Sequence, residues 1–295
     1  MRNHILALLL ALMAFGLTGC GDSNDYNQIS GQQGNPVAPG PNPTPTPSTQ
    51  AHLRIATLPL DFGDLDVLVN GTEAQSDAST GDVTNYFNVT SGQVRIQVRA
   101  AGSETDLLSQ NVTLTADTYH TVVISGIDSE DSELNTLGQS IDGLRLLTLV
   151  DDVTPNANGV SVRFVNAIPY EEGNDATIET PEGDDIAGPQ DYNTASSYVD
   201  FTEALDHDWV NLILPEVGET WRFDTEEATN KPIFTAIRDA LGGRPGNLSI
   251  FVTGNGNFMT AFVVIDNASE GGETFIFVGD LVQYSSLQAL RRRPC

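Results

Sequence analysis

Residues 94–99 read VRIQVR, and this stretch predicts the fold class. Its apolar residues alternate strictly with arginine or glutamine. Successive side chains of a β-strand point to opposite faces of a sheet, so the pattern is typical of a strand with one buried face and one solvated face. The same period of two recurs at residues 53–57 and 65–69, and Asn70-Gly71 then supplies a tight hairpin turn.

Further short strands are expected along the chain, separated by Gly, Asn, Asp and Ser. They are predicted at residues 83–89, 107–114, 119–125 and 144–150. Many short strands with turn residues between them predict an all-β protein of antiparallel, immunoglobulin-like β-sandwiches.

The order of strands occurs twice. Four phrases of the first copy are answered, in the same order, by phrases about 109 to 128 residues later. The pairs are residues 53–59 with 162–169, 94–98 with 210–214, 121–126 with 249–254, and 147–152 with 262–267. A run of turn-formers at 152–159, within the phrase DDVTPNANG, separates the copies. We therefore predict one sandwich at 51–155, which we expect to fold alone, and a second, diverged sandwich at 159–285.

The N-terminus indicates an export signal. Residues 5–17 are almost entirely apolar, too short for a permanent membrane span, and end in Leu17-Thr18-Gly19-Cys20. This ending resembles a bacterial lipobox, which implies a signal peptide at 1–19 and acylation of Cys20. Gly21 then favours the outer membrane of a Gram-negative envelope over the inner membrane. An ordinary secretory signal with a chance cysteine is the alternative.

The segments at the two ends of the folded part differ from it in composition. Residues 20–50 are rich in proline and lack an apolar period, which predicts a disordered, extended tether. Residues 286–295 end in RRRPC and form a basic tail. Because Cys20 would carry lipid, Cys295 is expected to be a free thiol, and the adjacent arginines favour its thiolate form. A tail that is trimmed or buried and has no role is the alternative.

Composition excludes several classes of protein. The 295-residue chain has 13 Lys plus Arg against 40 Asp plus Glu, a formal net charge of −27. Binding to nucleic acid needs clustered cations, so we expect no nucleic-acid partner. Two cysteines are too few for a disulfide scaffold or a Cys-rich zinc module.

The phrases LRI at 53–55, LDVLVNG at 65–71, VTSG at 89–92, YHTVV at 119–123 and LVDDVTP at 149–155 resemble domain of unknown function 4397. That family is bacterial, exported, often tandem and often lipid-anchored. The resemblance implies β-sandwich modules and carries no catalytic residues. The second copy departs from the pattern at 171–188, where an acidic, Gly-rich insert replaces the hairpin phrase.

Candidate site residues are few. Asp61, Asp64 and Asp66 offer hard oxygen ligands on one loop and are weak candidates for calcium, as is the acidic insert with its Glu171, Glu172, Asp175, Glu182, Asp184 and Asp185. The mature histidines, His52, His120 and His207, are expected to be unrelated. Trp209 and Trp221 could stack on a sugar, although burial of Trp209 is the better interpretation. No hydrolase elbow, zinc-protease motif or phosphate-binding loop occurs.

The sequence thus favours a lipid-anchored, acidic, non-catalytic envelope protein that presents two sandwiches to a protein or a glycan, with no cofactor. A calcium-dependent adhesive lipoprotein is the first alternative. An envelope hydrolase with an unrecognised site is the second.

Overall fold

The structure is a computed structural model, and it describes residues 49–128, 143–154, 160–169, 175–201, 209–214, 219–224, 246–254, 259–266 and 274–281. Within these ranges every regular element is a β-strand, which confirms the prediction of an all-β protein. No helix in the described part of the chain has the length and apolarity needed to cross a membrane. The signal peptide, residues 20–48 of the tether and the basic tail lie outside the described residues. Gln50, which the sequence assigns to the disordered tether, is instead the first residue of a β-strand.

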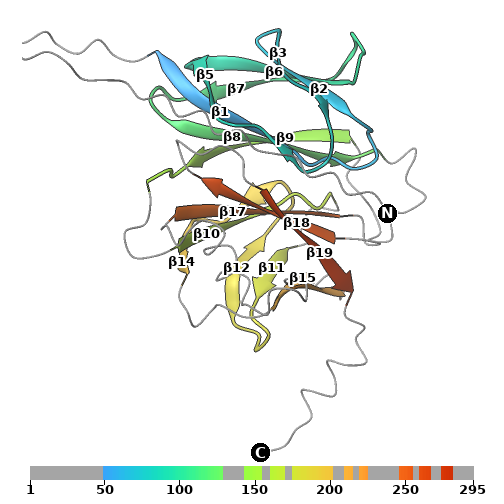
Figure 1. Cartoon of the computed structure of the whole chain (residues 1–295), viewed down its shortest axis with the longest axis vertical. Helices are drawn as coiled ribbons and strands as arrows, with labels where there is room; N and C mark the ends of the chain where they lie inside the picture. The colour runs from blue at the N-terminus through green and yellow to red at the C-terminus, as the bar shows by residue number, and fades with distance from the viewer. Residues whose placement is uncertain are drawn as a thin grey trace, which may run out of the picture. The chain divides into compact units, whose positions relative to one another are not determined.

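The strands fall into two groups, which we call the first half (β1–β9) and the second half (β10–β19) (Figure 1). The first half comprises β1 (Gln50–Thr57), β2 (Leu65–Val69), β3 (Thr72–Ala78), β4 (Asp82–Val83), β5 (Phe87–Thr90), β6 (Gly92–Ala100), β7 (Asp106–Leu114), β8 (Tyr119–Ile127) and β9 (Gly143–Asp151). The second half comprises β10 (Val160–Asn166), β11 (Ala176–Glu179), β12 (Asp185–Gln190), β13 (Thr194–Ala195), β14 (Val199–Phe201), β15 (Trp209–Leu214), β16 (Glu219–Asp224), β17 (Gly246–Gly254), β18 (Met259–Asp266) and β19 (Thr274–Leu281).

The first half is a sandwich of two sheets. One sheet has β1 at its centre, flanked by β8 and β9 on one side and by the short β4 and β5 on the other; the second has the order β3-β2-β6-β7. Val94, Ile96 and Val98 of β6 are buried in the core between the sheets, as the alternation at 94–99 predicts. Asn70 and Gly71 join β2 to β3 with φ angles of 53° and 78°, which confirms the predicted hairpin turn.

The second half repeats these pairings. β10 pairs with β13, β14 and β17, and β17 pairs with β18, as β1 pairs with β4, β5 and β8, and β8 with β9. The order β12-β11-β15-β16 likewise matches β3-β2-β6-β7. Part of the acidic insert therefore still forms a hairpin, β11–β12. The second half adds β19, which pairs with both β16 and β18 and joins the two layers into one ten-stranded sheet.

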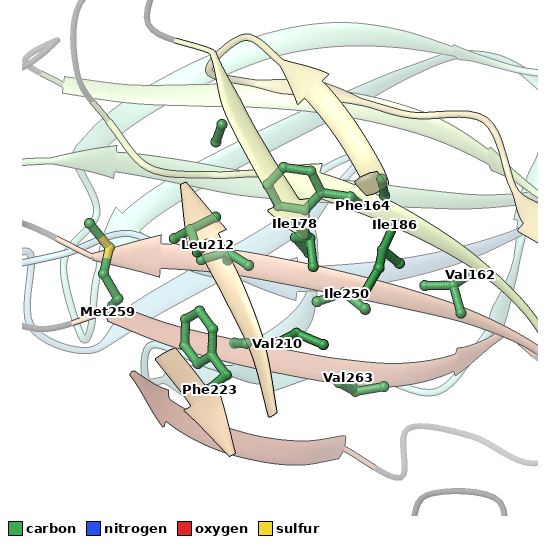
Figure 2. Close-up of a cluster of buried hydrophobic side chains, with 14 of the residues drawn as sticks. Val162, Phe164, Ile178, Ile186, Val210, Leu212, Phe223, Ile250, Met259 and Val263 are labelled. Atoms are coloured by element: carbon green, nitrogen blue, oxygen red, sulfur yellow. The ribbon is translucent and has the colours of Figure 1, made fainter. Parts of the chain in front are cut away.

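The core of the second half also lies between its layers. Figure 2 shows Phe164 and Ile250 from one layer close to Ile178, Leu212 and Phe223 from the other, all of them buried. In β15 the buried Val210, Leu212 and Leu214 alternate with partly exposed residues, as expected of a strand with one face in this core.

Most strand pairings are antiparallel, as predicted, but two are parallel. β1 and β8 are parallel, and so are β10 and β17. Between β1 and β8 the chain forms all four strands of the opposite sheet, together with β4 and β5 beside β1. It then returns as β8, which lies beside β1 and runs in the same direction. A long crossover of this kind permits parallel pairing, whereas a hairpin does not.

The two halves belong to one compact unit and share a third apolar cluster. It contains Ala56, Leu58, Val123 and Leu149 of the first half, and Val165, Ala167, Phe251, Phe262 and Val264 of the second. The sheet that contains β1 thus buries both of its faces: one in its own sandwich and the other against the second half. The predicted segment 51–155 has its own core, but separation would expose this second apolar face.

Candidate functional site

Of the three aspartates that the sequence offers as weak candidates for calcium, Asp64 and Asp66 form hydrogen bonds to neighbouring turns. Asp64 accepts a hydrogen bond from the Ser79 hydroxyl at 2.8 Å. Asp66 accepts hydrogen bonds from the backbone N–H groups of Gly102, at 2.8 Å, and Asp77, at 3.1 Å, and these bonds hold its pKa below the usual value. Asp61 occupies a left-handed turn, with φ of 64°. The carboxylates of Asp64 and Asp66 therefore stabilise turns around the hairpin.

In the described ranges no group of three or more His, Cys, Asp or Glu is arranged to hold a metal ion. Of the acidic insert, Glu182, Asp184 and Asp185 are exposed at the β11–β12 turn, and Asp175 precedes β11. Glu171 and Glu172 lie outside the described residues.

The structure separates the histidines that it describes. His52 stacks on Tyr119 with ring centroids 4.2 Å apart. His120 is buried and its Nε2 accepts the backbone N–H of Thr115 at 3.0 Å; burial lowers the pKa of this imidazole. The register pairs His52 with Tyr119 and Leu53 with His120, so the two imidazoles lie on opposite faces of the sheet. His207 is outside the described residues.

The remaining candidates fall beyond what the structure describes. Cys20 and Cys295 lie outside the described residues, and so do the side chains of Trp209 and Trp221, whose backbones belong to β15 and β16.

The most developed polar arrangement lies between the two halves and is formed by residues that the sequence did not single out. Two arginines and two aspartates are buried there: Arg54 on β1, Asp151 on β9, Arg163 on β10 and Asp266 on β18. We call these residues the four-charge cluster. Their residue exposures are between 0% and 5%, in a region where an unpaired charge would be very costly.

The pairing in the four-charge cluster crosses from one half to the other. An Arg54 terminal nitrogen donates to Asp266 Oδ1 at 2.5 Å, and an Arg163 terminal nitrogen donates to Asp151 Oδ1. Within each half the charges are farther apart: 3.8 Å from Arg54 to Asp151 and 3.9 Å from Arg163 to Asp266. Positive and negative charges therefore alternate around the cluster, and each arginine binds most closely to the aspartate of the other half.

Each half supports its own charges with a hydroxyl group. Arg54 Nε donates to Thr121 Oγ1 at 3.0 Å, and that hydroxyl donates to Asp151 Oδ2 at 2.6 Å. In the second half, Arg163 Nε donates to Ser249 Oγ, and the hydroxyl donates to Asp266 Oδ2, both at 2.6 Å.

A tyrosine completes each side. The Tyr86 hydroxyl donates to Asp151 at 2.7 Å, and the Arg54 guanidinium lies 4.7 Å from the centre of that ring. The Tyr198 hydroxyl donates to Asp266 at 2.6 Å, with Arg163 4.8 Å from its ring centre. Hydrogen bonds to ionised groups and cation–π contacts both gain strength when water is excluded.

The electrostatics of this site favour a charged Asp151, charged arginines and neutral tyrosines. Burial alone would raise the pKa of Asp151, but Arg163 and Arg54 outweigh it and hold the pKa below the usual value. Burial raises the pKa of both Tyr86 and Tyr198 far above that of a free phenol. The groups donate to and accept from one another, so the arrangement clamps the two halves together.

A signal for this site was present in the sequence. Arg54 and Arg163 occupy matching places in the first pair of repeated phrases, and Asp151 and Asp266 match in the last pair. A charged residue at the same place in both copies, on a strand that otherwise reads as buried, is an indication of a buried ion pair. The sequence could not indicate that each arginine reaches the opposite copy.

The comparisons with known proteins concern mainly the first half. No curated protein matches the chain. Residues 51–173, which run from β1 beyond the end of β10, match the model of the family described as domain of unknown function (DUF4397).

Proposed function

We propose that this protein is a lipid-anchored, non-catalytic component of the bacterial cell envelope, built from two tandem copies of the DUF4397 domain. A Pro-rich tether holds the two sandwiches away from the outer membrane, and their surface contacts another envelope protein or a glycan. The proposal combines the lipobox-like ending at Cys20, the composition of residues 20–50 and the repeated strand pairing.

The proposal that the protein is non-catalytic rests on one observation: the groups of the four-charge cluster bind one another and thereby join the two halves. All four charged residues of the cluster are buried. A pair of sandwiches clamped in this way is suited to present a surface of constant shape. Its acidic composition favours a partner with basic or hydrogen-bonding groups.

Photo-crosslinking in the native envelope tests the contact role. A photoreactive residue would replace Leu107, which is 49% exposed on β7, or Val199, which is 43% exposed on β14. We expect a discrete adduct with one partner at one of these positions. Ile96, fully buried in the first core, is the matched control and should give none. Adducts that appear equally at all three positions would contradict a specific contact surface.

The anchor is tested separately. Cys20→Ser should abolish lipid addition, so the protein leaves the membrane fraction or accumulates as an uncleaved precursor, as seen by fractionation and intact mass. Normal membrane retention with no added lipid would contradict the anchor. Melting curves with and without millimolar calcium test the adhesive alternative, and screening on glycoside, ester and peptide substrates tests the hydrolase alternative.

A further inference from the structure

The contact between the two halves is self-complementary. Each half contributes an arginine from its central strand, an aspartate, a tyrosine and a hydroxyl group, and each arginine binds the aspartate of the other half. The first half contributes Arg54, Tyr86, Thr121 and Asp151, and the second contributes Arg163, Tyr198, Ser249 and Asp266.

The shared apolar cluster is also built from equivalent residues of the two halves. In the alignment of the repeated phrases, Ala56 corresponds to Val165, Leu58 to Ala167, Val123 to Phe251 and Leu149 to Val264, and all eight residues belong to the shared apolar cluster. When patch i of one body contacts patch j of another and j contacts i, the contact has the two-fold character of an isologous dimer interface. This interface therefore has the properties of a contact between two copies, although a single chain forms it.

We infer that the same surface accepts a second copy of this chain, and that two chains can associate by exchanging halves. In the exchanged dimer the first half of each chain docks on the second half of the other, so Arg54 binds Asp266 and Asp151 binds Arg163 between chains. The covalent link between the halves runs from Asp151, the last residue of β9, to Val160, the first residue of β10, and exchange leaves the strand pairings within each half unchanged. The preserved contacts make such exchange a low-cost route to a dimer.

Complementary charge variants of the mature chain test this inference. All proteins carry Cys20→Ser and Cys295→Ser, which removes the lipid and any disulfide link between tails. Arg54→Asp places a carboxylate against Asp266, and Asp266→Arg places a guanidinium against Arg54, so neither variant can close its own chain. In a 1:1 mixture, however, exchange places the introduced carboxylate of one chain against the introduced guanidinium of the other. The same exchange restores the unaltered pair of Arg54 and Asp266 on the opposite side of the dimer.

We expect the mixture to double in mass from one chain to two, as measured by light scattering, with one chain of each variant in the complex. Each variant alone should not form this dimer, because its exchanged dimer would again place like charges at positions 54 and 266. A mixture that stays at the mass of one chain, with both variants folded by circular dichroism, would overturn the inference.

A second experiment uses the unaltered interface and does not depend on the folding of the variants. Two forms of the Cys20→Ser/Cys295→Ser chain with tags of different size are unfolded, mixed and refolded at low and at high protein concentration. We expect dimers that contain both tags, in a proportion that rises with concentration. Combining native, already folded forms is the control and should give far fewer mixed dimers. If only single chains are recovered at every concentration, exchange does not occur.

Discussion

Arg54 shows how a single charged side chain can be retained inside an apolar sheet face. It lies between Leu53 and Ile55, both fully buried, and is itself fully buried on the opposite face of β1. Its ion pair and hydrogen bonds compensate for the lost hydration, so the destabilising change is the removal of one partner alone.

Arg54→Met should therefore lower the free energy of unfolding by about 3–5 kcal/mol, because Asp266 would remain buried beside a weaker set of partners. Urea denaturation measures this loss. Arg95→Met is the matched control: Arg95 pairs with Asp106 on an exposed face, its side chain is 53% exposed, and its loss should cost less than about 1 kcal/mol. The double variant Arg54→Met/Asp266→Leu should recover part of the loss, and equal costs for Arg54→Met and Arg95→Met would contradict the role of the cluster.

Acid should weaken the clamp through Asp151. The arginines hold the pKa of Asp151 in the folded protein below its ordinary value of 3.8. Its contribution to stability is therefore complete above the ordinary carboxyl range and is lost as the pH falls through the lowered pKa. Thermal melting from neutral to acidic pH measures this dependence. Asp151→Asn, although less stable at neutral pH, should show a shallower fall at acidic pH, and an equally steep fall would rule out Asp151 as a source.

At the scale of elements, the turn between β3 and β4 is shaped by a strand of the other half. Gly81 has φ of +98°, and a Cβ built there would lie 2.2 Å from Cε1 of Phe262 on β18. Gly102, in the β6–β7 turn, also has a positive φ, of +72°, but a Cβ there would meet nothing within 4 Å. A side chain added at Gly102 would therefore cause backbone strain alone, whereas one added at Gly81 would also clash with Phe262 of the other half.

Gly81→Ala should be more destabilising than Gly102→Ala. Both changes incur about 1 kcal/mol of left-handed backbone strain, and Gly81→Ala adds about 1–3 kcal/mol for overpacking against Phe262. Chemical denaturation of both variants gives the comparison. Combining Gly81→Ala with Phe262→Leu should remove part of the excess, whereas equal effects of the two alanine variants would show that the contact with Phe262 is unimportant.

At the scale of the whole molecule, the shared apolar cluster and the four-charge cluster make the halves cooperative. The chain has two tryptophans, Trp209 and Trp221, and both belong to the second half. Fluorescence therefore reports the second half, while circular dichroism reports the strands of both.

We expect the fluorescence and circular dichroism transitions to coincide in the unaltered chain, as in a two-state unit. Ile96→Ala opens a cavity in the first core without changing the contact between halves, and it should shift the fluorescence transition of the second half as well. In Arg54→Met the two transitions should separate, because the link is weakened. If the fluorescence transition is the same in Ile96→Ala as in the unaltered chain, the halves unfold independently. That result would agree with the expectation that segment 51–155 folds alone.

Strands with a clear period of two, such as β2 and β6, could be predicted from the sequence because their signals are local, whereas the predicted strand 83–89 is two short strands, β4 and β5. Alternation at 94–99 places one face of β6 in a core, and Asn70-Gly71 adopts the left-handed turn that joins β2 to β3. The repeated phrases indicated equivalent strands before any pairing was known. At the site, the alignment of the two copies already matched Arg54 with Arg163 and Asp151 with Asp266.

Only the tertiary structure decided which strands and which charges meet. The parallel pairing of β1 with β8 depends on the crossover between the sheets, which no local pattern encodes. The cross-pairing of Arg54 with Asp266 depends on the second half covering a sheet face that also carries Ala56 and Val123. A strand's period of two shows which residues share a face, but what covers that face follows from the packing of segments far apart in the chain.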